Sequence, residues 1–190
     1  MKRIALVGDI GSGKTFYSKL FGYPVFNADL VVSNLYQKDK FLFRKIKKKF
    51  PNKIRNFPMK KEELLKIIFQ KQKNLNILGK IIHPIVRKKM KSFLKKNKKK
   101  KFVVLDVPLF LENKLNTRKD TIVFIDANKK RINQKLKKRK NINLKLINKL
   151  RKNQLPIRLK KKRSTYVIKN NFVRNTAKKN VKMILKKISK

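Results

Sequence analysis

Continuous runs of apolar residues alternate along the chain with stretches in which apolar residues recur every three or four positions. A short continuous apolar run is typical of a strand that is buried on both faces of a parallel sheet. The pattern therefore predicts five strands, the second of which ends in Asp29. These runs occupy residues 3–8, 23–29, 101–108, 120–128 and 165–171.

The segments between the runs favour helices. Residues 14–22 predict a short helix closed by Gly22. Most of 30–97 has helical spacing, and Pro84 suits the first turn of a helix within that stretch.

The second half of the chain continues this alternation. Residues 129–154 predict two basic helices joined near Asn141, and apolar residues from Val181 to Ile188 predict a closing helix. Strands joined by helical crossovers indicate an α/β fold with a doubly wound, five-stranded parallel sheet and flanking helices. We expect a single domain over residues 1–190, because no internal repeat or linker interrupts the chain.

Charge is strongly one-sided. The chain has 57 Lys and Arg against 9 Asp and Glu, for a formal net charge of +48, while 41% of its residues are hydrophobic and suffice for a core. Such a field attracts polyanions, and nucleic acid is the first partner to consider. The alternative is a genome whose base composition favours Lys, Asn and Ile codons, since the lysines are spread along the whole chain.

Several classes are excluded by what the sequence lacks. It contains no cysteine, so it forms no disulfide and no thiolate metal site. The apolar start is too short for a signal peptide, and no stretch is long enough to span a bilayer. We expect a cytoplasmic protein without a membrane partner.

The stretch "GDIGSGKT", from Gly8 to Thr15, holds three of the chain's five glycines. It fits the phosphate-loop pattern G-x-x-x-x-G-K-[ST], and it follows a strand and opens a helix, as that pattern requires. Bare main-chain amides of Gly11, Ser12 and Gly13 can surround phosphate oxygens, and the helix N-terminus adds positive potential. Lys14 is expected to bridge the β- and γ-phosphates and the Thr15 hydroxyl to ligate magnesium. The alternative is an ordinary strand-to-helix turn.

The loop does not reveal how the nucleotide is used. The chain has no N-K-x-D guanine signature, so an ATPase or a small-molecule kinase is left.

The few acids are informative. Asp29 stands where a carboxylate can accept the proton of a substrate hydroxyl, or it caps the following helix. Asp106 ends the third strand and either holds magnesium through water or is a solvent-facing strand end. Asp126 is a weaker candidate, and Glu112 follows the third strand closely enough to face the same crevice. His83 is the sole histidine; it shares a helix face with Arg87 and is either structural or part of a site.

These segments together resemble the dephospho-coenzyme A kinase family. The matching stretches cover essentially the whole chain: "GDIGSGKT", "NAD", "HPIVRKKM", "LDVPLFLEN" and "NQLPIRLKKKRSTYVIKNN". The resemblance implies a P-loop NTPase fold that transfers the γ-phosphate of ATP to the ribose 3′-hydroxyl of dephospho-CoA, with magnesium. It also implies a helical substrate-binding region over 30–97 and a basic lid over 128–155.

Roles carried over by the resemblance follow the chain. Residues from Gly11 to Phe16 hold ATP, and Asp29 is the base. His83 and Arg87 lie on the substrate side, and Arg139 is a lid arginine over the phosphates.

The chain departs from the family pattern at a few positions. Phe16 replaces a second hydroxyl residue, and Asn27 and Thr165 replace acids. A lid position that is usually arginine is Leu150, with Arg151 beside it.

The implied partners are ATP and dephospho-CoA, bound by a monomer. Two rival functions remain: another P-loop kinase of a nucleotide or small alcohol, and a nucleic-acid-binding ATPase. The second is disfavoured because the sequence offers no RNA-binding motif with interleaved aromatics, so no specific nucleic-acid partner is expected.

Overall fold

The computed structural model describes residues 1–138 and 143–189, apart from the side chains of Gln72 and Leu144. The chain forms two compact units. The first combines Met1–Asn27 with Asn97–Lys190, and the second is Ala28–Lys96. The single-domain organisation predicted from the sequence, with its helical and lid subregions, stays a prediction.

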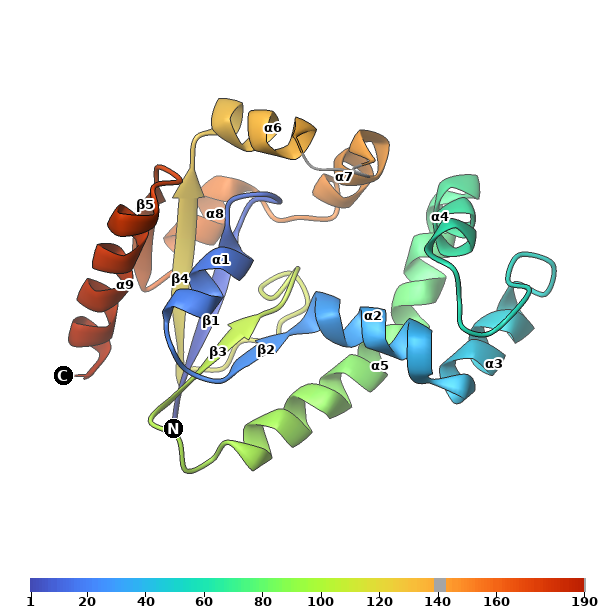
Figure 1. Cartoon of the computed structure of the whole chain (residues 1–190), viewed down its shortest axis with the longest axis horizontal. Coiled ribbons are helices and arrows are strands. Elements are labelled where there is room, and N and C mark those ends of the chain that lie inside the picture. The colour runs from blue at the N-terminus through green and yellow to red at the C-terminus, as the bar shows by residue number, and fades with distance from the viewer. Residues whose placement is uncertain (139–142, 190) are drawn as a thin grey trace. The chain divides into compact units, whose positions relative to one another are not determined.

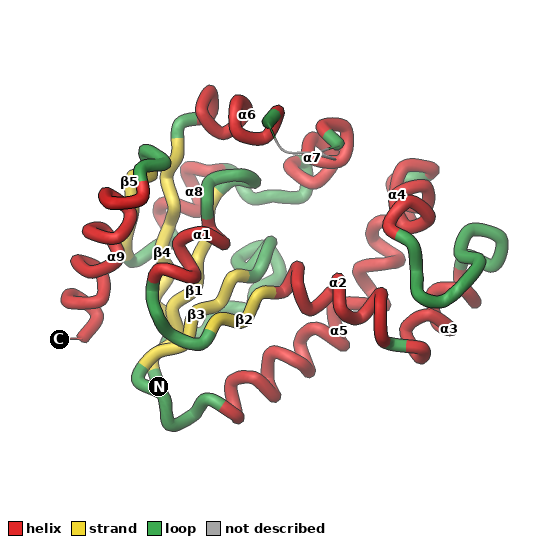
Figure 2. Tube along the Cα trace, viewed as in Figure 1, coloured by secondary structure: helices red, strands yellow, loops and turns green. Residues whose placement is uncertain are grey.

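The first unit is built on a parallel sheet, as the apolar runs predicted (Figures 1 and 2). Its strands occur in the spatial order β2-β3-β1-β4-β5 and all pair in parallel. The strands are β1 (Lys2–Gly8), β2 (Val25–Asn27), β3 (Phe102–Asp106), β4 (Asp120–Ala127) and β5 (Tyr166–Asn170).

The register of the strands brings their carboxyl ends to one edge of the sheet. Gly8 at the end of β1 pairs with Ile125 of β4, and Asn27 at the end of β2 pairs with Asp106 at the end of β3. The loops that follow these strands therefore start close together, which is where open α/β sheets bind their ligands.

Helices α1 (Lys14–Leu20) and α9 (Arg174–Ser189) complete the main core of this unit. Figure 1 shows α9 running beside β5. Its buried side chains recur at helical spacing and pack against alternate residues of the strands, so one face of the sheet is sealed from water. The buried positions of α9 are Ala177, Val181, Ile184 and Ile188.

Three further helices follow β4: α6 (Lys129–Lys137), α7 (Leu144–Arg151) and α8 (Ile157–Lys162). The sequence predicted α6 and α7 but not α8, whose six residues are too few to show a helical period. Side chains of α6 and α7 share a small apolar cluster with the phosphate loop and the segment after β5, so these helices are attached to the loop. That cluster consists of Ile132, Leu136, Ile147, Ile10, Ala127 and Phe172.

The second unit has helices joined by loops and no strand among its described residues, in line with the mostly helical spacing over 30–97. Its core is a separate cluster that includes Leu42, Ile46 and Ile67, each fully buried. The helices are α2 (Ala28–Lys38), α3 (Lys40–Lys49), α4 (Lys61–Gln70) and α5 (Gln72–Lys96).

The prediction that Pro84 stands in a first helical turn was wrong. It lies inside α5, which begins at Gln72. An interior proline removes one main-chain hydrogen bond and costs about 3 kcal/mol. Apolar residues on both sides of it, among them Leu78, Ile82 and Val86, pack into the same core. Their burial keeps the helix continuous through the proline.

Candidate active site

Glycine is required in the loop between β1 and α1. Gly11 and Gly13 have φ angles of 84° and 98°, which other residues rarely adopt. A Cβ on Gly13 would lie 2.8 Å from Nδ2 of Asn170, and one on Gly11 would lie 3.0 Å from Ile132. Side chains are therefore excluded at Gly11 and Gly13, so a phosphate group can approach the main chain of this turn closely.

Asn170, the last residue of β5, supports the loop from beneath. Its side-chain amide donates to the Ser12 carbonyl at 2.8 Å, and its Oδ1 accepts from the Phe172 amide at 2.8 Å. The Tyr17 hydroxyl donates to the same Oδ1 at 3.4 Å. One buried amide thus joins the phosphate loop, α1 and the end of the sheet.

The loop's lysine lies along the loop itself. The Nζ atom of Lys14 donates to the carbonyl oxygens of Asp9, at 2.8 Å, and of Gly8, at 3.3 Å. This places a positive charge beside the glycine turn, where a phosphate chain is expected.

Thr15 and Asp106 meet at the start of α1. The Thr15 hydroxyl donates to Oδ2 of Asp106 at 2.7 Å, and the Asn27 side chain donates to the same oxygen at 2.8 Å. Asp106 is 4% exposed, so this carboxylate is not a solvent-facing strand end. A hydroxyl and a carboxylate oxygen at this distance suit magnesium, a hard cation that usually takes one or two carboxylates together with substrate phosphates and water. The described residues contain no cluster of three acidic or histidine side chains, so this pair is the candidate donor set.

Ser12 and Phe16, also predicted to hold ATP, lie in different surroundings. Ser12 is fully buried, and its Oγ has no hydrogen-bond partner among the described residues. Phe16 is 42% exposed at the start of α1 and packs edge-to-face against Tyr17.

A carboxylate within the loop faces an arginine at the end of α7. Oδ2 of Asp9 lies 3.5 Å from Nη2 of Arg151, and Oδ1 accepts from the Ile10 amide at 2.6 Å. Leu150, the residue before Arg151 in the sequence, is apolar and half-buried. Arg139, the predicted lid arginine, lies outside the described residues.

The structure places Glu112 against the segment that follows α7. Its Oε1 accepts from the Leu155 amide at 2.9 Å and pairs with Lys160, whose ammonium lies 2.9 Å away. Lys160 is only 3% exposed and also donates to Gln154. Asp126, the weaker candidate, pairs with Lys161 at 3.0 Å on the surface.

Asp29 does not end a strand, contrary to the prediction. Strand β2 ends at Asn27, whose side chain bonds to Asp106, and α2 begins at Ala28. Asp29 therefore lies in the first turn of α2, where the helix dipole favours a negative charge. Asp29 is two residues after Asn27 in the sequence.

His83 and Arg87 share one face of α5, one turn apart, as their spacing predicted. The imidazole is exposed, but one side of it rests on Gly79, where an added Cβ would lie 3.2 Å from the ring. This partial burial lowers the pKa of His83, and the positive charge of Arg87 lowers it further. His83 is thus neutral near pH 7 and can donate and accept hydrogen bonds.

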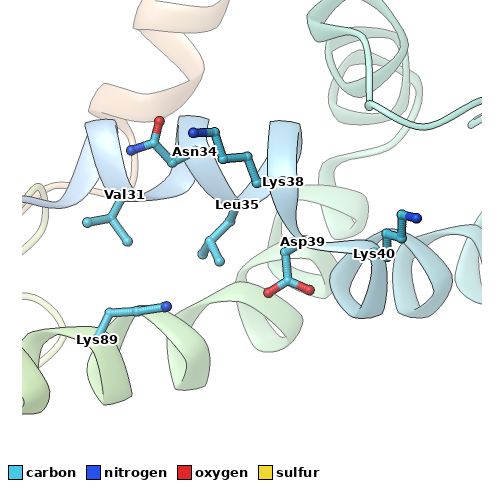
Figure 3. Close-up of a pocket in the computed structure, with 7 residues that line it drawn as sticks. All are labelled: Val31, Asn34, Leu35, Lys38, Asp39, Lys40 and Lys89. Atoms are coloured by element: carbon cyan, nitrogen blue, oxygen red, sulfur yellow. The ribbon is translucent and has the colours of Figure 1, made fainter.

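The helical unit contains a pocket of about 410 Å³, lined by Val31, Asn34, Leu35, Lys38, Asp39, Lys40 and Lys89 (Figure 3). Figure 3 shows Val31 and Leu35 of α2 directed toward the side where α5 presents Lys89. Ammonium groups around an apolar floor suit a ligand that has both negative charge and an apolar portion. Neither His83 nor Arg87 lines this pocket.

Sequence reasoning gave no role to Asp9 or Asn170, and it noted Arg151 only as the neighbour of the lid position Leu150. Asp9 lies inside the phosphate-loop pattern, at a position where the pattern accepts any residue. Asn170 and Arg151 act on the loop from more than a hundred residues away, and no local signal marks such contacts. No helix among the described residues has the length and apolarity needed to cross a membrane.

Comparison with known proteins identifies a family. The family model described as dephospho-CoA kinase matches residues 2–175. A dephospho-CoA kinase from Wolbachia sp. subsp. Brugia malayi is 32% identical over 98% of this chain and 97% of its own. One from Wolbachia pipientis wMel is 36% identical over 87% of each chain.

A solved structure supports the fold. The crystal structure of TT1252 from Thermus thermophilus covers 98% of this chain and 97% of its own with a TM-score of 0.80. Its sequence is 23% identical to this chain, so the similarity supports the fold and says nothing about function.

Proposed function

The chain belongs to the dephospho-CoA kinase family, and from this we propose that it transfers the γ-phosphate of ATP to the ribose 3′-hydroxyl of dephospho-CoA. The observation that carries the proposal is the phosphate loop with Thr15 bonded to Asp106 at 2.7 Å. An ATP-dependent kinase needs its phosphate-binding loop beside oxygen ligands for a metal ion, and these residues have the chemistry that both functions require.

The proposed division of labour begins with binding. Main-chain amides from Gly11 to Thr15 and the ammonium of Lys14 hold the β- and γ-phosphates. Thr15 and Asp106 would hold magnesium, which neutralises charge on the phosphate oxygens when bound. Arg139 is proposed to add a further positive charge over the phosphates.

Asp29 is proposed as the general base. Its carboxylate accepts the proton of the acceptor 3′-hydroxyl while that oxygen bonds to the γ-phosphorus and the bond to the ADP oxygen breaks. The position of Asp29 two residues after β2 supports this role, because the strand ends at the same edge as the phosphate loop.

The helical unit is proposed to bind the acceptor. Its pocket supports this assignment, since dephospho-CoA carries a diphosphate and a long, weakly polar arm. His83 and Arg87 are proposed to contact the substrate, and Glu112 is a further proposed substrate-binding residue. A cytoplasmic location and a monomeric state stay predictions.

A coupled assay of ADP release tests the function. Purified protein with ATP and Mg²⁺ is expected to release ADP rapidly when dephospho-CoA is added, and mass and phosphorus NMR spectra of the product should show one new 3′-phosphate. Shikimate and deoxyadenosine serve as competing acceptors. Equal ADP release without dephospho-CoA, or a preference for another alcohol, would overturn the proposal.

A further inference from the structure

Asp9 places a negative charge inside the loop that is to hold a triphosphate. It is 8% exposed, and its Oδ1 is fixed by the Ile10 amide at 2.6 Å. Its carbonyl accepts from Lys14 and from the Ser12 amide, so its main chain is part of the loop's own bonding. An uncompensated carboxylate at this position would repel the phosphates of a nucleotide.

Arg151 supplies the compensating charge. Its Nη2 lies 3.5 Å from Oδ2 of Asp9 and donates to Oδ1 of Asn133 at 3.4 Å. Both contacts are long for charged hydrogen bonds, which are usually below 3 Å. Its Nε is buried and has no hydrogen-bond partner among the described residues. The guanidinium is thus held beside the loop with hydrogen-bonding capacity still to be used.

The surroundings keep this arginine near the loop. Ile147 of α7 packs with Ile132 and Leu136 of α6, and Ile10, the neighbour of Asp9, joins the same apolar cluster. The two members of the pair therefore sit on elements that share a core. A guanidinium presents its donors as a planar fork, which can contact a carboxylate on one side and a phosphate oxygen on another.

We propose that Arg151 binds the phosphates of the nucleotide and that Asp9 is its positioning residue. This inference rests on the proposed kinase function. Arg151 neutralises Asp9 and offers donors to the incoming phosphates, and Asp9 in turn keeps the guanidinium over the loop. Removing Arg151 alone leaves the carboxylate of Asp9 without its ion partner beside the nucleotide. The resulting loss of ATP affinity should therefore depend on the presence of Asp9.

Four proteins test the pair: the parent, Arg151→Gln, Asp9→Asn and the double variant, each assayed for binding of ATP with Mg²⁺ by calorimetry. Arg151→Gln is expected to weaken ATP binding about tenfold or more when Asp9 is present, the size of one charged hydrogen bond. In the Asp9→Asn background the same change should cost about threefold or less, because no carboxylate is left unpaired. Arg151→Lys should restore part of the affinity, and the KM for dephospho-CoA should stay as in the parent.

The matched control is Lys152→Gln, which removes the same charge from the next, exposed residue and should change ATP affinity less than twofold. An Arg151→Gln protein that is folded by circular dichroism and binds ATP like the parent would overturn the inference. So would an equal cost of Arg151→Gln in both backgrounds. If the parent binds ATP but does not phosphorylate dephospho-CoA, the proposed function fails while the pair can still be judged from ATP binding.

Discussion

The hydroxyl of Thr15 lies 2.7 Å from Oδ2 of Asp106, so the first turn of α1 is bonded to the end of β3. Two oxygen donors of the kind that a hard cation prefers are thereby brought together from positions 91 residues apart. The burial of Asp106 excludes a solvent-facing strand end, and its proposed part in binding magnesium stays a prediction.

Asp106→Asn is expected to raise the Mg²⁺ concentration for half-maximal activity by about tenfold or more, because an amide is a weaker ligand than a carboxylate. Turnover measured against Mg²⁺ concentration checks this. Asp126→Asn is the matched control, since Asp126 lies in β4 and pairs with Lys161 on the surface. An unchanged Mg²⁺ dependence in Asp106→Asn would remove this residue from the metal site.

Asp29→Ala is expected to lower kcat by about a hundredfold or more, the usual contribution of a general base, while ATP affinity stays as in the parent. Single-turnover kinetics and calorimetry separate the two effects. Glu62→Ala provides the comparison, because Glu62 is likewise an acid in the first turn of a helix. Near-normal turnover of the purified Asp29→Ala protein would show that another group takes the proton.

Arg3→Ala is expected to reduce the free energy of unfolding by about 3 kcal/mol, because it leaves a buried carboxylate without its ion partner. Nε of Arg3 lies 2.7 Å from Oδ1 of Asp120, whose side chain is 0% exposed. Lys161→Ala, at the exposed pair with Asp126, should cost less than about 1 kcal/mol. Urea unfolding of both variants measures the difference, and equal losses would contradict the role of burial.

The loss in Arg3→Ala should also depend on pH. Burial raises the pKa of Asp120, although the Thr117 amide and Arg3 lower it in part. Without Arg3 that pKa rises further above its unfolded value, so the folded state holds the proton more tightly. Stability of the variant should therefore fall as the pH rises, with the smaller loss at acidic pH.

His83 is expected to titrate below its ordinary pKa of 6.5, because partial burial and then Arg87 lower it. Because the pKa of His83 is lower in the folded protein than in the unfolded chain, the unfolded chain binds the proton more readily. The free energy of unfolding should therefore decrease as the pH falls through 6.5. NMR of tag-free protein follows this single histidine. Arg87→Ala should raise the pKa of His83, and Lys88→Ala should leave it nearly unchanged. An unchanged pKa of His83 in Arg87→Ala would contradict the electrostatic effect of Arg87.

Much of the fold was readable from local pattern. Continuous apolar runs predicted each strand of the described sheet, and the glycines predicted a phosphate site in the loop, because each signal depends on neighbouring residues. The prediction for Pro84 was wrong because a local rule for helix starts does not include tertiary packing. Apolar contacts on both sides of the proline keep α5 continuous. Asp29 was misplaced by two residues, a normal uncertainty at the end of an element.

The long-range contacts that hold the site residues in place could not be predicted from local sequence patterns. Asn170 reaches Ser12 and Glu112 reaches Lys160 only after the sheet has formed and brought distant segments together. A lysine that is 3% exposed cannot be told from dozens of exposed ones by sequence, because only its contacts distinguish it. Such pairs become visible when the folded geometry is known.

The partners of the scarce acids have a consequence for the surface. Within the first unit each carboxylate is engaged by a named group: Asp9 by Arg151, Asp106 by Thr15 and Asn27, Glu112 by Lys160, Asp120 by Arg3 and Asp126 by Lys161. The remaining surface lysines of that unit must be neutralised from solution, by a layer of small counterions that an arriving nucleotide has to displace. Apparent ATP affinities measured in chloride, glutamate or phosphate buffers will therefore differ for the same protein, and the choice of anion belongs among the variables of any assay.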